Sequence, residues 1–260
     1  MKYKFLIIFR IISVIILVAG TIYIIIWNHN NNSNKQLQSS LVSYVKNTSI
    51  SIPNENLNTI NLKSESSKST NATTNIDSIE VDFNSLLQKN SETVGWIRIS
   101  NTNIDFPVVK AQNNSFYINH DFEKKWNPAG WIFSDYRNNF PNLETNTIIF
   151  GHNRRNGTMF SSLNNYLEHQ PNDSILFATT NSIYTAEIFS LYRVTAKNLD
   201  LPISFASQTD FSQTINSWKE KSIYQFNTPI QEDDKILTIC TCANNSSYRI
   251  ILHAKLTKIK

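Results

Sequence analysis

The sequence is poor in glycine, with five glycines among its 260 residues. No two of them have the spacing of a GxGxxG turn or a Walker A loop, the glycine-rich segments that proteins wrap around dinucleotides and nucleotide phosphates. The sequence therefore excludes a dinucleotide-binding domain and a P-loop nucleotide hydrolase.

Cysteine and charge are scarce as well. Two cysteines cannot make a disulfide-stabilised scaffold, and no pair of C-x-x-C motifs is present to build the usual structural zinc site. The net charge of +4 comes from 24 Lys and Arg against 20 Asp and Glu. This excess is too small and too scattered to indicate nucleic-acid binding, so we expect no nucleic-acid partner.

A long apolar run opens the chain. Residues 5–27 contain few polar side chains, and about 20 apolar residues are enough to cross the hydrocarbon core of a membrane. Lysines precede the run and asparagines follow it, so the positive-inside rule puts the N-terminus in the cytoplasm and the rest of the chain outside the cell. We therefore expect residues 1–27 to form a cytoplasmic stub and a single-pass anchor in the cell membrane.

Two other interpretations of this run stay open. A cleaved signal peptide is the first, although its apolar core usually measures about 7–15 residues and this run continues past Ala19 and Gly20 to Ile26. A buried core helix is the second, and it is disfavoured because no face of the run is polar.

Residues 28–77 are rich in Asn, Ser, Thr and Lys, and their apolar residues are sparse. Such a composition buries too little apolar surface to offset the entropy lost on ordering, so it predicts a mobile extracellular linker. A folded domain of residues 78–260 is expected to follow it.

Short β-type runs separated by turn-like clusters dominate this domain. About eight such strands with few helices are typical of a mostly β barrel or sandwich. The expected strands cover residues 94–99, 104–109, 131–133, 147–150, 175–178, 183–194, 236–241 and 248–256.

Two helices are expected beside the strands. Apolar residues recur at helical spacing over residues 79–87, with Asp82 placed to favour the N-terminus of the helix. The same spacing recurs over residues 211–222, where Asp210 or Ser212 is the expected N-cap.

The two cysteines lie two residues apart in one expected strand. Their side chains therefore share a face, and a disulfide between them would be strained. Cys242 ends the strand, whereas Cys240 lies deeper. A reactive thiol needs partial exposure and a cationic neighbour, so Cys242 is the candidate nucleophile, and a pair of core-filling thiols is the alternative.

A cysteine nucleophile also needs a proton acceptor. Among the five histidines, His152 follows an expected strand directly, at its exit into a polar loop. It is the candidate base, although a lone histidine is more often structural. His29 lies in the expected linker, His120 in a loop, His169 near a helix end and His253 inside the last strand.

Acyl transfer builds negative charge on a carbonyl oxygen, which a fixed cation can stabilise. Arg249 starts the strand that follows Cys242, and a tight connection would bring it back beside the thiol. Its guanidinium is always charged and offers a rigid fork of donors. The alternative is a strand arginine that pairs with a surface carboxylate.

These residues lie in motifs that resemble those of the sortases, the cysteine transpeptidases of Gram-positive cell surfaces. Residues 238–242, TICTC, resemble the TLxTC signature, with Ile239 in place of the usual leucine. Residues 249–255 resemble the strand that carries the sortase arginine, and residues 146–153 resemble the histidine motif. Stretches similar to class B sortases cover residues 94–99, 103–109, 119–122, 133–137, 159–163 and 211–222.

The resemblance extends roughly over residues 80–258 and implies a fold. That fold is a closed eight-stranded sortase-type β-barrel with an N-terminal helix and one helix inserted before the cysteine strand.

The resemblance also implies a reaction without metal or cofactor. The Cys242 thiolate would attack after the threonine of a C-terminal sorting signal and form a thioester. Arg249 would hold the substrate and stabilise the oxyanion, and His152 would act as general acid and base. The implied partners are secreted surface proteins that carry the signal and an amine of a peptidoglycan precursor or a pilin. Thr241, Asn153, Asp135 and Tyr136 are weaker candidates, for substrate binding.

Three alternatives stay open. A membrane-anchored cysteine hydrolase or peptidase would use the same three residues with water as the acceptor. A metal-binding module would combine the two cysteines with His152 and His253. A non-catalytic surface-binding domain of the same fold would not need the Cys242 thiol.

Overall fold

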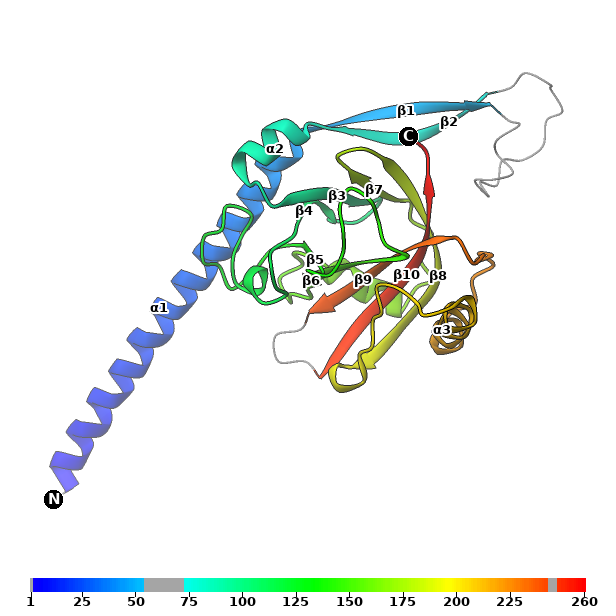
Figure 1. Ribbon diagram of the computed structural model, residues 1–260. Coiled ribbons are helices and arrows are strands. Elements are labelled where there is room, and N and C mark those ends of the chain that lie inside the picture. The colour runs from blue at the N-terminus through cyan, green and yellow to red at the C-terminus, as the bar shows by residue number, and fades with distance from the viewer. Residues whose placement is uncertain (1, 54–72, 243–246) are drawn as a thin grey trace.

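The computed structural model describes residues 2–53, 73–242 and 247–260. Its body is a closed barrel of eight strands (Figure 1). The strands are β3 (Thr93–Ile99), β4 (Asp105–Val109), β5 (Phe133–Ser134), β6 (Asn146–His152), β7 (Ile175–Thr179), β8 (Ile183–Thr195), β9 (Lys235–Cys242) and β10 (Tyr248–Lys258). Short 3-10 helices lie at η2 (Phe116–Ile118), η3 (Ser161–Leu167) and η4 (Ala196–Asn198).

The strand order around the barrel is β10-β8-β7-β3-β4-β5-β6-β9. Each of the eight expected strands overlaps one of these, and the short β5 is displaced the most. The predictions of a mostly β chain and of a closed eight-stranded barrel are therefore confirmed.

Alternation along β9 separates two apolar clusters. Leu237 and Ile239 belong to the core inside the barrel. Ile236 and Cys240 belong to a second cluster, which we call the outer cluster, under the helix α3 (Gln208–Lys221). Figure 1 shows α3 outside the barrel wall, on the side away from the N-terminal helix. Cys240 is 1% exposed, which agrees with its expected depth.

The helix α3 confirms the apolar stripe but corrects the expected cap. The N-cap is Ser207, whose hydroxyl accepts a hydrogen bond from the backbone N–H of Asp210 at 3.1 Å. The Asp210 carboxylate in turn accepts from the N–H of Ala206 at 2.9 Å. The helix therefore begins before the first apolar residue of the stripe, because Ser207 satisfies the amide of Asp210 in its first turn, while Asp210 holds the residue before the cap.

The shorter helix α2 (Phe83–Lys89) begins where Asp82 predicts. Asp82 is the N-cap and accepts from the backbone N–H of Ser85 at 3.1 Å. The expectation that the helix includes Ile79 is wrong, because Ile79 is a buried residue of strand β2 (Thr73–Val81).

The expected mobile linker is the main correction where the structure describes it, at residues 28–53 and 73–77, and residues 54–72 of that prediction lie outside the described residues. The helix α1 (Lys2–Val42) runs through the asparagine-rich residues without a break, and β1 (Val45–Pro53) pairs with β2 in an antiparallel hairpin. Composition suggested disorder, but Leu41 is fully buried against the core and the asparagines of α1 hydrogen bond to the barrel. The domain boundaries at residues 27 and 77 stay predictions.

The first part of α1 projects alone, beyond the barrel (Figure 1). It is long and apolar enough to cross a membrane, and its apolar side chains are exposed rather than buried in the protein. These properties are compatible with a single membrane anchor, and they do not fit the buried core helix.

A buried histidine helps to dock α3 on the barrel. Trp218 of α3 stacks on the ring of His253, with centroids 3.8 Å apart. The amide nitrogen of Asn146 donates to a backbone carbonyl, so its oxygen accepts from the Thr238 hydroxyl. Thr238 then accepts from His253 Nδ1 at 2.8 Å, and His253 Nε2 accepts from the Tyr192 hydroxyl at 3.1 Å. Burial holds the pKa of His253 well below the ordinary value, so the imidazole is neutral and its Nε2 is the acceptor in the bond with Tyr192.

We expect the barrel to lose stability on mild acidification because of His253. In the unfolded chain a histidine takes up a proton near pH 6.5, whereas folded His253 takes one up only at much lower pH. The unfolded state thus binds more protons below pH 6.5, and the free energy of unfolding falls there by at most about 1.4 kcal/mol per pH unit for this group.

Thermal melting of the full chain in detergent between pH 7.5 and 5 measures this slope. His253→Gln should flatten it. The matched control, His169→Gln at an exposed position, should leave it unchanged. Equal slopes in all three proteins would contradict the expectation.

Candidate active site

Two parallel strands bring His152 beside Cys242. β6 ends at His152 and β9 ends at Cys242. The two strands are neighbours in the barrel, and their register pairs His152 with Cys242. Two residues that are far apart in the sequence therefore end their strands side by side, at one edge of the barrel.

The strand β10 adds Arg249 from the other side of β9. The two strands are antiparallel, with Ile251 opposite Cys240. The same register continued by two residues puts Arg249 opposite Cys242. Alternate residues of a strand share a face, so the positions of Arg249 and Cys242 lie on the face of the outer cluster. Arg249 is partly exposed, and its Nη1 donates to the carbonyl of Tyr248 at 3.1 Å.

His152 shares this face, because it alternates with Ile148 of the outer cluster. The three candidate residues thus occupy adjacent positions on three neighbouring strands, and for Cys242 the backbone register gives this placement. A base, a thiol and a guanidinium so arranged are suited to nucleophilic acyl transfer.

The segment 116–130 holds the imidazole of His152. The side chain is 2% exposed, and its Nε2 donates to the carbonyl oxygen of Ile118 at 2.6 Å. Nδ1 is then the free acceptor of the neutral ring. Gly130 has a positive φ of 59°, and a Cβ there would lie 2.9 Å from the ring and closer still to two carbonyl oxygens. Glycine is therefore required for the backbone to cover His152 so closely.

The surroundings of His152 favour its neutral form. Burial is the main cause that lowers its pKa, and the positive charges of Arg154 and Arg249 lower it further. The hydrogen bond to Ile118 acts in the opposite direction, but the net effect is a pKa below the ordinary value. At neutral pH the ring is thus ready to accept a proton.

We expect Arg154→Gln to raise the pKa of His152, because it removes a nearby charge that disfavours the imidazolium. NMR titration of the His152 Cε1–H signal, in the full chain in detergent, measures the shift. Arg155→Gln is the matched control, since it removes the same charge from the exposed neighbour. An equal rise in both variants, or none in Arg154→Gln, would contradict the expectation.

The other histidines lie away from this arrangement. His253 is in the outer cluster under α3, and His120 stacks on Phe116 with ring centroids 4.1 Å apart. His169 and His29 are exposed.

In the alternative of a metal-binding module, His253 would be one of the metal ligands, but its side chain is already engaged. Both ring nitrogens of His253 are engaged, by Thr238 and Tyr192. In the part of the chain that the structure describes, no three His, Cys, Asp or Glu side chains gather in a group suited to a metal ion.

The weaker substrate-binding candidates differ in exposure. Thr241 is 1% exposed, and its hydroxyl accepts from the backbone N–H of Ile250 at 2.8 Å. It therefore links β9 to β10 next to Cys242. Tyr136 is 49% exposed, and Asn153 is partly exposed and hydrogen bonds to Asn164. Tyr136 and Asn153 are thus the two that a ligand can reach directly.

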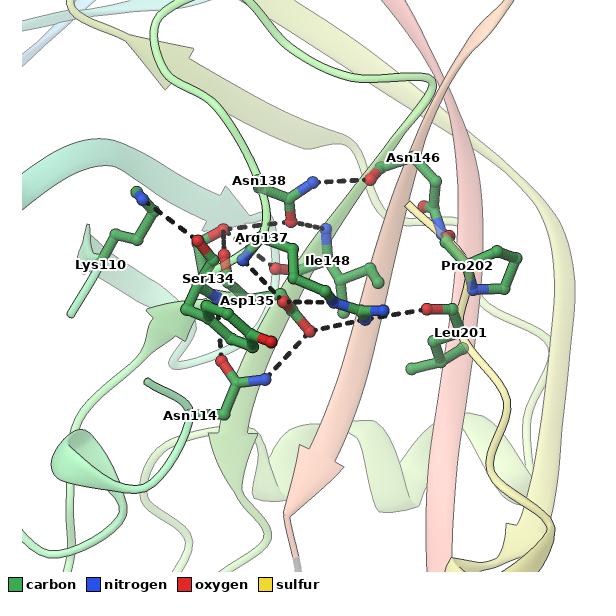
Figure 2. A network of polar contacts seen from close by, with 11 residues as sticks. Lys110, Asn114, Ser134, Asp135, Arg137, Asn138, Asn146, Ile148, Leu201 and Pro202 are labelled. Carbon is green, nitrogen blue, oxygen red and sulfur yellow. Dashed lines mark hydrogen bonds and ion pairs between the residues drawn. The ribbon is translucent and has the colours of Figure 1, made fainter. Parts of the chain in front are cut away.

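Asp135 belongs to a buried polar network before β6 (Figure 2). Arg137 donates to both of its carboxylate oxygens at 2.9 Å, and Asn114 donates at 3.0 Å. Burial alone would raise the pKa of Asp135, but these hydrogen bonds outweigh it and hold the pKa below the ordinary value. Nearby, the amide of Asn138 donates to the carbonyl of Asn146 at 2.8 Å. The network fixes the connection that leads into the His152 strand.

Sequence reasoning missed the residues that hold His152. Ile118 acts through its backbone carbonyl, which no side-chain pattern reveals. Gly130 is isolated in a glycine-poor chain, and Arg154 lies two residues after His152. The isolated glycine and the nearby arginine were visible in the sequence, but only the fold shows that both lie close to the His152 ring.

A polar groove of about 710 Å³ lies beside the loop that follows His152. Asn103, Arg154 and Tyr166 are among its lining residues, whereas His152 and Arg249 are not. It is therefore adjacent to the candidate site and distinct from it.

Comparisons with known proteins agree with the fold of the barrel. The family model for the sortase domain matches residues 97–257. Sortase B of Listeria monocytogenes is 34% identical over 194 residues, which is 71% of this chain and 78% of the relative. A Staphylococcus aureus sortase B–substrate complex is 33% identical with a TM-score of 0.64, covering 68% of this chain and 85% of the other. A Bacillus anthracis crystal structure described as similar to sortase B is 28% identical with a TM-score of 0.68, covering 90% and 98%.

Proposed function

We propose, since this chain belongs to the sortase family, that Cys242, His152 and Arg249 are its catalytic residues. Its similarity to sortase B proteins makes it a class B cysteine transpeptidase. Cys242 is the nucleophile of this proposal, His152 the general acid and base, and Arg249 the group that stabilises the oxyanion. The observation that carries the proposal is the register of β6, β9 and β10, which lines the three positions up on one face.

The first half-reaction cleaves the substrate. Neutral His152 first accepts the proton of the Cys242 thiol. The resulting thiolate attacks the carbonyl carbon of a threonine in a C-terminal sorting signal, and Arg249 binds the oxyanion of the tetrahedral intermediate. His152 donates a proton to the leaving amine as the C–N bond breaks, which leaves a thioester on Cys242.

The second half-reaction transfers the acyl group. An amine attacks the thioester carbonyl, His152 accepts the proton from that amine, and the Cys242 thiolate leaves as the new amide forms. The acceptor in this proposal is an amine of a peptidoglycan precursor or a pilin lysine. The S. aureus sortase B structure described as a substrate complex supports the binding of a substrate by a barrel of this kind.

The apolar part of α1 supports a location at the cell membrane. A single-pass anchor with its N-terminus in the cytoplasm holds the barrel outside the cell, where secreted surface proteins emerge. Such a location brings the enzyme to both of its proposed partners, the surface protein and the cell-wall amine.

The test is intact-mass spectrometry of the full chain in detergent, incubated with a set of sorting-signal peptides and no added amine. The full chain is needed because a cut near residue 78 would remove Leu41, which is buried in the core. An acyl adduct mapped to Cys242, released as an amide when triglycine is added, supports the proposal. Release of free acid alone, whether or not triglycine is present, would favour the hydrolase alternative. A folded enzyme that forms no adduct with any peptide would contradict the assigned nucleophile or the substrate class.

A further inference from the structure

The helix α1 joins its apolar run to the barrel without a flexible break. The run ends at Trp27, and with a rise of 1.5 Å per residue Asn30 lies only about 4.5 Å further along the helix. Asn34, four residues on, is already buried against the barrel at 2% exposure. Any part of the barrel that contacts Asn30 therefore lies next to the apolar run.

Two segments of the barrel contact α1 at residues 30–34. The amide of Asn127 donates to the carbonyl oxygen of Asn30 at 3.3 Å and to Oδ1 of Asn34 at 2.8 Å. From the loop after His152, Arg154 donates to Oδ1 of Asn31 at 2.9 Å. These bonds fix the level of the barrel along the helix axis.

The residue before Asn127 is an exposed tryptophan. Trp126 is 62% exposed, whereas Trp96, Trp131 and Trp218 are at most 3% exposed. Tryptophan side chains are enriched at membrane–water interfaces, where the apolar ring and the polar N–H are both accommodated. The position of Trp126, one residue from the contact with Asn30, puts an indole at the level of the end of the apolar run.

The charges around Trp126 are paired. Lys124 forms an ion pair with Glu92 at 3.1 Å, and Lys125 forms one with Glu123 at 2.5 Å. The loop therefore carries no strong net charge that would attract it to a lipid surface, and the indole is its group that suits such a surface.

We propose that residues 123–128, which we call the interfacial loop, contact the phospholipid surface of the membrane that α1 spans. Trp126 inserts at the level of the headgroups and gives the barrel a second attachment point. This inference rests on the membrane anchoring proposed above. The loop belongs to the same segment, 116–130, that covers His152. Lipid contact therefore orients the wall of the active site relative to the membrane.

The test places a polarity-sensitive NBD label on single cysteines of the full chain, in a Cys240→Ala, Cys242→Ala background. The protein is reconstituted in vesicles of phosphatidylcholine and phosphatidylglycerol. At Trp126→Cys we expect emission shifted to the blue and iodide quenching at least threefold lower than at Ile223→Cys. Ile223 is the matched control, because it is an exposed apolar residue just after α3, on the other side of the barrel (Figure 1).

A third label, at Val18→Cys in the apolar run, separates the two possible failures. If position 18 is protected from iodide while positions 126 and 223 are quenched equally, the interfacial loop does not contact lipid, and the proposed membrane anchor is still supported. If position 18 is quenched as well, the anchor fails and this inference fails with it. Trp126 and Ile223 are exposed, so both substitutions should leave the circular dichroism and melting temperature unchanged.

Discussion

Cys242→Ala is expected to abolish turnover, with a loss of at least about 10³-fold, because no thioester can form without the sulfur. Cys240→Ala is expected to keep most of the activity. Cys240 is buried in the outer cluster under α3, so its truncation leaves a small apolar cavity and removes no reacting group. Chromatography of sorting-signal peptide cleavage, with triglycine as the acceptor, measures both variants.

The comparison of the two cysteines is informative because they are neighbours on one strand face. A general weakening of β9 would affect both variants, whereas loss of the nucleophile affects only one. Circular dichroism establishes that each variant is folded before the rates are compared. Comparable activity of the two folded variants would rule out Cys242 as the nucleophile.

Arg249→Lys is expected to lower kcat by about 10²-fold, the usual effect of removing one oxyanion donor. Lysine keeps the positive charge but loses the rigid fork of N–H groups. If Arg249 acts on the oxyanion, the loss falls mainly on kcat, because that charge exists in the tetrahedral intermediate and is absent from the bound substrate. Steady-state kinetics with the peptide substrate separate the change in kcat from the change in KM.

Arg193→Lys is the matched control. Arg193 is an exposed arginine on β8, the other neighbour of β10, where it lies over the ring of Tyr248. It has no place in the proposed mechanism, so its rate should stay near that of the unchanged enzyme. Near-normal kcat in Arg249→Lys would mean that this arginine is structural, as the alternative interpretation holds.

The barrel was largely predictable from the sequence, because its strands carry clear local signals. Short apolar runs such as residues 236–241 are bounded by polar turns, and α3 has an apolar stripe that needs only one face of the barrel to cover it. The prediction that these strands close into a barrel came from the resemblance to the family's motifs. Local patterns fix the strands, whereas the partners of each strand depend on contacts distant in the sequence.

The N-terminal segment was not predictable in the same way. Asn31 and Asn34 indicate disorder by composition, yet the barrel supplies partners for them, namely Arg154 and Asn127. Each of these hydrogen bonds joins residues far apart in the chain, so no window of sequence contains both halves. The same limit applies to the carbonyl that holds His152. The roles of the candidate residues themselves stay predictions until the substitutions above are measured.

The pairing of β6 with β9 also sets the moment at which catalysis becomes possible. A parallel pair needs a long crossover connection, and here β7, β8 and α3 all lie between the two strands in the sequence. A chain grows from its N-terminus, so the helix α1 is complete long before the strand that carries Cys242, and Arg249 comes later still. An unfinished chain therefore lacks two of the three candidate catalytic positions until its last two strands close the barrel.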